Sequence, residues 1–284
     1  MKWSNPVCEG ADPFLLRCGD TYYHYATLTP DQGFTVRSSR DLTHWEEHGF
    51  CLRRGDVAGN GGFWAPEVLE RDGKFYMVYV ADEHLGVAVA DSPLGPFTQA
   101  EKRFLDDRCA IDGHFFVDED NSVYLYFVRF DHGNVLWCAK MREDLLSFDP
   151  DSAVFLLRAE AEWETRLGSV LEGPFVLRHG TRYYLTYSAN DFRSPDYAVG
   201  YAISDSPLGP FVRAAENPIL RRSDFCSGTG HHSFTSAPDG TLLCVYHTHR
   251  SPAQVHPRMT CIDRAAFVSD RLVIYGPTQS AALI

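Results

Sequence analysis

Apolar and aromatic positions follow one pattern that occurs five times along the chain. A turn residue is followed by an aromatic-rich run typical of a β-strand, as in GDTYYHYAT and GKFYMVYVA. The five copies begin at Gly19, Gly73, Asn121, Gly180 and Gly240. A shorter apolar run precedes each turn, and a third strand-like run follows each copy. The pattern therefore predicts five antiparallel units, each built on a hairpin.

The spacing of the copies predicts the fold class. Consecutive turn residues lie about 50 to 60 residues apart, and a repeat of this length made of short strands is typical of a propeller blade. We predict an all-β, five-bladed β-propeller that forms a single domain over residues 1–284, because all five copies are needed to close a ring. In such a ring the first strand of every blade lines the central axis.

Side chains suited to chemistry stand one to three residues before the short apolar run of each copy. They are Asp12, Trp64, Asp112, Glu172 and His231. Because corresponding positions of the blades converge on the axis, we expect these five side chains to line one cavity. The alternative is that the three carboxylates are structural and cap the turns of the blades.

Three carboxyl groups in one pocket suit hydrolysis of a glycosidic bond. One must be protonated to donate to the leaving oxygen, and another must be ionised to activate water or attack carbon. The third can raise the pKa of the acid by like-charge repulsion. The sequence therefore favours glycoside hydrolysis among the chemistries open to an acidic pocket.

Composition narrows the partners and the compartment. The formal net charge of −12 argues against nucleic acid or an anionic membrane as partner, and no apolar run is long enough for a membrane span. The eight cysteines are scattered without a CxxC pair, which favours free thiols. The amino-terminal residues lack the apolar segment of a signal peptide, so we expect a cytoplasmic protein.

The sequences around the five candidate residues resemble glycoside hydrolase family 43. The matching segments are Ala11-Asp12-Pro13, Trp64-Ala65-Pro66-Glu67, Ile111-Asp112-Gly113, Glu172-Gly173-Pro174 and Gly228-Thr229-Gly230-His231-His232-Ser233, one per blade and in the order of the family. The resemblance implies a five-bladed propeller, inversion at the anomeric carbon and arabinose- or xylose-containing plant glycans as substrates. It also implies that Asp12 is the general base, that Glu172 is the general acid, and that Asp112 tunes and orients Glu172.

The resemblance extends to substrate and metal contacts. It implies that Trp64 forms an aromatic wall of the sugar site and that His231 is an axial residue which reaches a central, structural Ca²⁺, often through water. No cofactor is implied for the chemistry itself. Arg250 resembles an arginine that hydrogen-bonds the sugar, and Arg258 competes for the same role. The alternatives are a core aromatic at Trp64 and a plain hydrogen-bonding role for His231.

We therefore expect an inverting, exo-acting glycoside hydrolase that releases a pentose, α-L-arabinofuranosyl by preference, from small plant-derived oligosaccharides. A β-xylosidase is the first alternative. A retaining β-fructosidase would carry an Asn-Asp pair where this chain has Ala11-Asp12. A non-catalytic, sugar-binding propeller would not need three axial acids.

Overall fold

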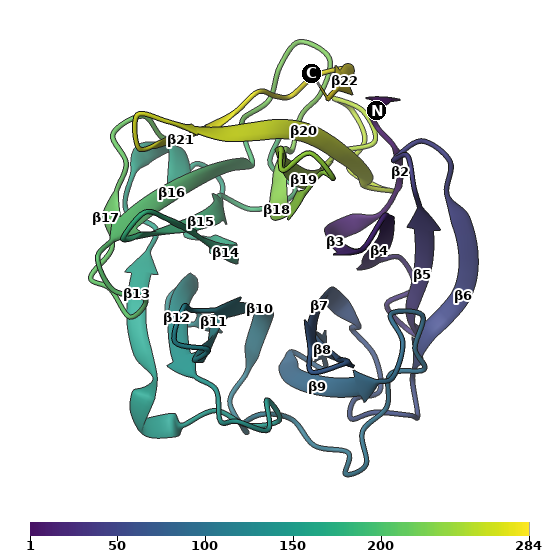
Figure 1. Ribbon diagram of the computed structural model, residues 1–284. Helices are drawn as coiled ribbons and strands as arrows, with labels where there is room; N and C mark the ends of the chain where they lie inside the picture. The colour runs from purple at the N-terminus through teal and green to yellow at the C-terminus, as the bar shows by residue number, and fades with distance from the viewer. Residues whose placement is uncertain (284) are drawn as a thin grey trace.

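The computed structural model describes residues 1–283 as a ring of five β-sheets around a central axis (Figure 1). Blade I contains β3 (Ala11–Cys18), β4 (Thr21–Thr27), β5 (Gly33–Ser39) and β6 (Glu46–Arg53). Blade II contains β7 (Trp64–Arg71), β8 (Lys74–Ala81) and β9 (His84–Ala90). Blade III contains β10 (Ala110–Val117), β11 (Val123–Phe130), β12 (Asn134–Lys140) and β13 (Val154–Arg158). Blade IV contains β14 (Leu171–His179), β15 (Arg182–Ala189), β16 (Ala198–Ser204) and β17 (Val212–Arg213).

Blade V joins the two ends of the chain. It contains β18 (Gly230–Ser236), β19 (Leu242–Thr248) and β20 (Met259–Val268), with β21 (Arg271–Ile274) and the amino-terminal β2 (Cys8–Glu9) both paired to β20. Nearby, β1 (Lys2–Ser4) pairs with β22 (Ser280–Ala282), so the termini lie side by side. The first strands contact one another around the full circle, from β3 through β7, β10, β14 and β18 back to β3. The predicted all-β, five-bladed propeller is confirmed.

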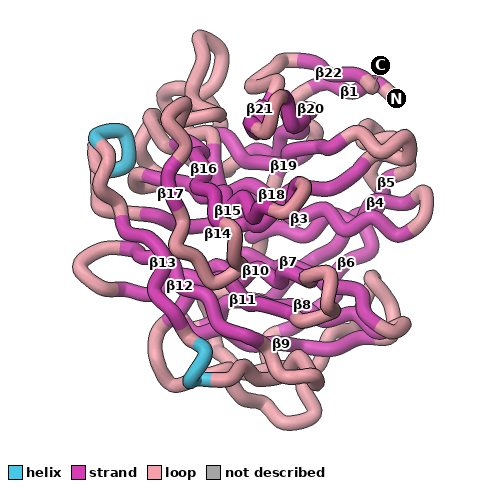
Figure 2. The backbone as a smooth tube through the Cα atoms, turned by 60° about the vertical axis from the view of Figure 1, so that its left-hand side comes forward, coloured by secondary structure: helices cyan, strands magenta, loops and turns pink. Residues whose placement is uncertain are grey.

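The aromatic strands pack the blades against one another. A separate cluster of buried apolar side chains fills each of the five junctions between neighbouring blades. Buried tyrosines recur in these clusters, with Tyr25 between blades I and II and Tyr126 between blades III and IV. The turned view shows strands joined by many loops, and the helical parts within residues 1–283 are two short turns, η1 (Pro150–Ser152) and η2 (Glu162–Glu164) (Figure 2). No helix within residues 1–283 is long and apolar enough to cross a membrane.

An irregularity repeated at the start of every first strand presents side chains to the axis. In each blade the pairing of the first and second strands shifts by one residue near the axis, which is a β-bulge. In each first strand, the residue that follows the last pair before this shift has a left-handed backbone: Asp12, Ala65, Asp112, Gly173 and His231, with φ between 42° and 56°. In non-glycine residues this conformation costs about 1–3 kcal/mol each and is concentrated at functional sites.

The strand directions bring one set of loops to one end of the ring. First strands begin at this end, second strands finish there, third strands start there, and the connections between blades return to it. We call this end the mouth. The loops between second and third strands are long in blades IV and V, over residues 190–197 and 249–258, and short in blade II. The walls of the mouth are therefore uneven.

Candidate active site

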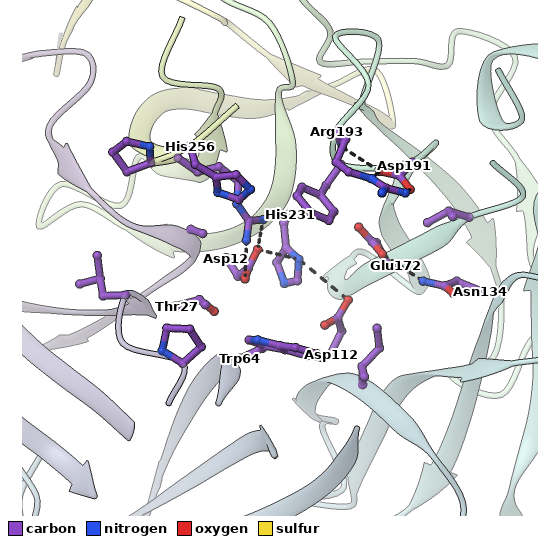
Figure 3. A pocket seen from close by; sticks show the side chains of 18 of the residues that line it. Asp12, Thr27, Trp64, Asp112, Asn134, Glu172, Asp191, Arg193, His231 and His256 are labelled. Atoms are coloured by element: carbon purple, nitrogen blue, oxygen red, sulfur yellow. Dashed lines mark hydrogen bonds and ion pairs between the residues drawn. The ribbon is translucent and has the colours of Figure 1, made fainter. Parts of the chain in front are cut away.

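A cavity of about 810 Å³ lies at the mouth and is lined by residues from all five blades (Figure 3). It contains all five residues that the sequence predicts to converge: Asp12, Trp64, Asp112, Glu172 and His231. The bulges explain the convergence, because Asp12, Asp112 and His231 occupy the left-handed position while Trp64 and Glu172 occupy the residue before it. Ala65 and Gly173 fill the left-handed position in those two blades.

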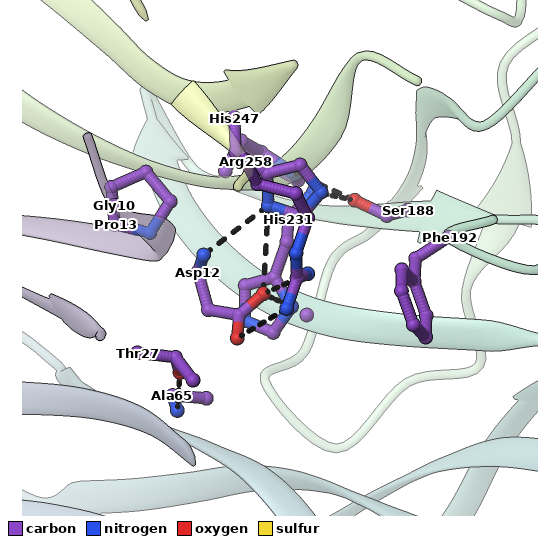
Figure 4. A network of polar contacts seen from close by, with 12 residues as sticks. Gly10, Asp12, Pro13, Thr27, Ala65, Ser188, Phe192, His231, His247 and Arg258 are labelled. Atoms are coloured by element: carbon purple, nitrogen blue, oxygen red, sulfur yellow. Dashed lines mark hydrogen bonds and ion pairs between the residues drawn. The ribbon is translucent and has the colours of Figure 1, made fainter. Parts of the chain in front are cut away.

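Asp12 is buried and surrounded by cationic and imidazole groups (Figure 4). Arg258 Nη1 donates to Asp12 Oδ1 at 2.8 Å, and Nη2 lies 3.5 Å from Oδ2. His231 Nδ1 is 3.3 Å from Oδ1. Burial alone would raise the pKa of Asp12, but Arg258, His231 and His247 together outweigh it and hold the pKa below its usual range. Asp12 is therefore ionised at any ordinary working pH.

Glu172 is equally buried but has the opposite electrostatic environment. Burial raises the pKa of Glu172 to about 7, and the nearby Asp112 adds to the effect. Two neutral donors hold its oxygens: Tyr197 O–H donates to Oε1 at 2.8 Å and Asn134 Nδ2 donates to Oε2 at 3.0 Å. Glu172 therefore carries a proton in slightly acidic to neutral solution, in a fixed orientation.

Asp112 and His231 lie between the base and the acid. Gly173 N–H donates to Asp112 Oδ2 at 3.1 Å, and His231 Nδ1 lies 3.9 Å from the same oxygen. Burial raises the pKa of Asp112, and Asp12 reinforces this while His231 opposes it. For His231 burial lowers the pKa, but the surrounding carboxylates outweigh burial and raise it. The imidazolium of His231 is thus stabilised in the middle of the three acids.

A stacked pair of rings connects the base to the acid. The backbone N–H of Asp12 donates to His247 Nδ1 at 3.2 Å, and burial keeps the pKa of His247 well below its ordinary value, so this ring is neutral. His247 stacks on Tyr197 with ring centroids 5.6 Å apart and an interplanar angle of 12°. Since Tyr197 also donates to Glu172, one rigid assembly sets the position of both carboxyl groups.

The sequence offers Arg250 and Arg258 as the arginine that contacts the sugar, and of these two only Arg258 lines the cavity, where Arg193 is also present. Arg250 is exposed and donates to Met259 Sδ at 3.4 Å, and it is not among the described residues that line the cavity. Arg258 lines the cavity, and its guanidinium lies 4.7 Å from the centre of the Phe192 ring. Arg250 is therefore not brought to the site.

Several residues of the site were missed from the sequence, among them Asn134, Tyr197 and Phe192. A positional signal existed, because Asn134 begins a third strand while Tyr197 and Arg258 each immediately precede one. The starts of the third strands thus form a second ring of corresponding positions around the mouth. Phe192 has no such signal, since it lies inside the long loop of blade IV.

The side chains near His231 do not by themselves supply the ligands of a calcium ion, so an ion there would be held largely through water. Ca²⁺ takes six to eight oxygen ligands, whereas within residues 1–283 no three His, Cys, Asp or Glu side chains converge on a metal position. Beneath His231 the axis holds a cavity of about 20 Å³, which is room for about one water molecule. His231 as a metal contact, and the structural Ca²⁺, stay predictions, and no catalytic step requires either.

Solved structures resemble this chain over nearly its whole length. An endo-1,4-β-xylanase from Bacteroides thetaiotaomicron superposes with a TM-score of 0.93 and 39% sequence identity, over 96% of each chain. A thermostable family-43 glycoside hydrolase superposes with a TM-score of 0.91 and 39% identity, over 99% of this chain and 98% of that one.

Sequence comparisons agree with the structural ones. The model of glycosyl hydrolases family 43 matches residues 3–272. A β-D-galactofuranosidase from Aspergillus niger is 29% identical over 94% of this chain and 82% of its own length. An extracellular exo-α-(1→5)-L-arabinofuranosidase from Streptomyces avermitilis is 26% identical, and a xylosidase/arabinosidase from Butyrivibrio fibrisolvens is also 26% identical. The matched regions cover 87% and 76% of this chain but 56% and 44% of those two proteins, about half their length.

Proposed function

Because the chain belongs to glycosyl hydrolases family 43, and is thus a glycoside hydrolase, we propose that it is an inverting, exo-acting enzyme that releases a terminal pentose from small oligosaccharides. The observation that carries the proposal is the pair of buried carboxyl groups in one cavity with opposite pKa perturbations. Asp12 is held ionised, and Glu172 has a pKa of about 7. Such a division supplies a base and an acid at the same pH.

In the proposed reaction Glu172 donates its proton to the glycosidic oxygen as the bond to the anomeric carbon breaks. Asp12 removes a proton from a water molecule, whose oxygen attacks the anomeric carbon from the opposite face. The transition state has oxocarbenium character, and the product has the inverted configuration. Asp12 finishes protonated and Glu172 ionised, and exchange of one proton with solvent restores both.

The neighbouring groups prepare the two carboxyls for these roles. Arg258 contacts Oδ1 of Asp12 at 2.8 Å and Oδ2 at 3.5 Å, so Oδ2 is the less engaged oxygen and the one we assign to the water. Tyr197 and Asn134 occupy one oxygen of Glu172 each. When Asp112 is ionised, its negative charge raises the pKa of Glu172 and so favours the protonated form of Glu172.

The shape of the cavity supports exo action on a small substrate. Its lining comes from every blade, including Thr27 of blade I, Glu83 of blade II and Phe192 of blade IV, so walls surround it on all sides of the axis. Its volume of about 810 Å³ falls within the range of small-molecule sites. A terminal sugar enters such a pocket more readily than the middle of a polymer. One structural relative is named an endo-1,4-β-xylanase, and this name favours the alternative, cleavage at internal bonds of a polymer.

The preferred sugar in this proposal is α-L-arabinofuranose. The galactofuranosidase and arabinofuranosidase relatives act on furanosides whose rings share one configuration and differ in the exocyclic group. A pocket that fits this furanose ring would accept the substrates named for both relatives, the galactofuranosidase and the arabinofuranosidase. The second candidate is a β-xyloside, which the xylosidase/arabinosidase relative favours.

A cytoplasmic location is part of the proposal. All eight cysteines are free thiols, as is usual in a reducing compartment. Fractionation of cells that make the protein at native level tests this, because recovery in the medium or in an envelope fraction would contradict it.

Aryl glycosides of α-L-arabinofuranose, β-D-galactofuranose and β-D-xylopyranose test the substrate assignment. We expect the highest kcat/KM on the arabinofuranoside. A preference of tenfold or more for the xyloside would favour the second candidate, and turnover of polymeric xylan at internal bonds without release of single pentoses would refute exo action. Proton NMR of the first-formed sugar tests stereochemistry, since a product with the substrate's own anomeric configuration contradicts inversion.

A further inference from the structure

A second cavity lies at the mouth, separate from the one that holds the three acids. Its volume is about 290 Å³, and its lining consists of Trp163, Arg166, Asp196, Ala198, Pro218, Arg221 and Arg222. Besides Ala198 at the start of β16, three loop segments contribute: the connection from blade III to blade IV, the loop over residues 190–197, and the connection from blade IV to blade V. By the strand directions of the propeller, all three run at the mouth.

The charge of this cavity is opposite to that of the chain. Three guanidinium groups line it against the single carboxylate of Asp196, although the whole chain carries a net charge of −12. Arg166 Nη1 lies 3.2 Å from Asp196 Oδ2, and Arg222 Nε lies 3.0 Å from Oδ1. Arg221 is exposed and has no ion-pair partner within residues 1–283. The local charge is therefore strongly positive.

Most hydrogen-bond donors of these arginines remain available. A guanidinium carries five N–H donors in a planar fork that matches a carboxylate. Asp196 engages one nitrogen of Arg166 and one of Arg222. The remaining donors of both, and all those of Arg221, are free to bind a second anionic group. The side chains of Arg166 and Arg222 are about half exposed, so a solute can reach them.

An aromatic ring accompanies the arginines. Trp163 stacks on the buried Tyr187, with ring centroids 6.1 Å apart and an interplanar angle of 17°. Its edge packs so closely on Gly200 that a Cβ there would come within 2.7 Å of the ring. Trp163 is thus rigidly held while it lines the cavity. A fixed aromatic surface beside a few directed polar groups is the usual composition of a small-molecule site.

The second cavity shares a loop with the first. Asp191, Phe192 and Arg193 line the cavity of the three acids, and Asp196 lines the arginine-rich one. Three residues of extended chain span at most about 11 Å. The two cavities therefore adjoin the same short stretch of loop, at a separation that an oligosaccharide of a few units matches.

We propose that the arginine-rich cavity binds a sugar that bears a carboxylate, that is, a uronic acid unit or branch of the oligosaccharide substrate. The guanidinium groups of Arg221 and Arg222 hold the carboxylate, and Trp163 contacts the sugar ring. Binding of the free acid follows from the cavity alone, whereas its connection to the substrate rests on the proposed function.

Calorimetric titration of the full chain with D-glucuronate, D-glucose and inorganic phosphate tests the site directly. We expect glucuronate to bind at least tenfold more tightly than either comparison solute. The double variant Arg221→Gln/Arg222→Gln should weaken glucuronate binding at least tenfold. The matched control Arg182→Gln removes an exposed arginine from the far end of β15 and should leave the affinity within twofold.

Three results would overturn the assignment: phosphate binding as tightly as glucuronate, glucose binding as tightly, or no loss in the double variant. The first would leave a site for any anion, and the second a site for neutral sugars. Glucuronate should also leave hydrolysis of a small aryl pentoside unchanged, because the substrate occupies the other cavity; competitive inhibition would place the acid among the catalytic residues and refute the location.

Kinetics connects the site to the substrate. In the double variant KM for a glucuronate-bearing oligosaccharide should rise about tenfold while kcat and the KM for the undecorated oligosaccharide stay unchanged. An equal change for both substrates would contradict the proposal. Activity on aryl pentosides without glucuronate binding would refute this inference alone, and glucuronate binding without pentosidase activity would refute the proposed function alone.

Discussion

Replacing Glu172 with glutamine should stabilise the folded protein at alkaline pH. The pKa of Glu172 in the folded protein is about 7, against an ordinary value of 4.5, and one pH unit is worth 1.36 kcal/mol. Ionising this buried side chain therefore costs the folded state about 3 kcal/mol more than it costs the unfolded chain. Glutamine has the size of glutamate and never ionises, so Glu172→Gln removes that cost.

The sign follows from the direction of the perturbation. Because the pKa is raised on folding, the stabilising effect of the bound proton is complete below about pH 4.5 and is lost as the pH rises to about 7. The free energy of unfolding of Glu172→Gln minus that of the wild type should therefore increase by about 3 kcal/mol between pH 4.5 and pH 8. Lost or altered hydrogen bonds to Tyr197 and Asn134 add an offset that does not vary with pH.

Urea unfolding followed by fluorescence at several pH values measures this difference. Glu101→Gln, which alters an exposed glutamate outside the cavity, is the matched control and should differ from the wild type by less than about 0.5 kcal/mol throughout. A constant difference between Glu172→Gln and the wild type from pH 4.5 to pH 8 would refute the assignment of Glu172 as a buried, protonated acid.

Three further changes probe the neighbours of the acid and the base. Since the pKa of Glu172 is about 7, we expect the alkaline limb of the wild-type pH–rate profile near pH 7, and Asp112→Asn, which removes a negative charge near Glu172, should move this limb to lower pH; an upward movement would contradict the role of Asp112. Arg258→Gln removes a charged hydrogen bond to Asp12 worth about 1.5–3 kcal/mol and should lower kcat/KM by roughly 10- to 100-fold, whereas Arg250→Gln should stay within about twofold; comparable losses would show that Arg250 reaches the substrate. If the Ca²⁺ predicted near His231 is bound, exhaustive chelation should lower Tm or activity, whereas full activity and an unchanged Tm would leave His231 as a plain hydrogen-bonding residue.

The sequence was most informative where the fold repeats. The hairpins and the five axial residues could be predicted because each blade presents a similar short segment at the same place in the ring. Once Asp12 is placed before the apolar run of blade I, the corresponding position in blade IV points to Glu172. The left-handed bulges that turn these side chains inward were not visible, since positive φ values are uncommon for any non-glycine residue and Ala65 adopts one without a side chain that favours it. Tertiary contacts around the ring impose that conformation.

Contacts across blades account for what was missed. Tyr197 bonds Glu172 and stacks on His247, and no local motif shows that these three residues meet. The choice between Arg250 and Arg258 depended on where the loop of blade V returns to a strand, because the residue immediately before β20 faces the cavity. Length and turn geometry of a loop determine that point, and the repeat pattern contains neither.

The dependence of each variant on the leaving group tests the division of roles between Asp12 and Glu172 most directly. Hydrolysis rates are measured for Glu172→Gln and Asp12→Asn on one aryl pentoside whose phenol has a low pKa and one whose phenol has a high pKa. Glu172→Gln should lose far more activity on the high-pKa phenol, which needs protonation, while Asp12→Asn should lose equally on both. If Asp12→Asn shows the leaving-group dependence and Glu172→Gln does not, the acid and the base have been assigned the wrong way round.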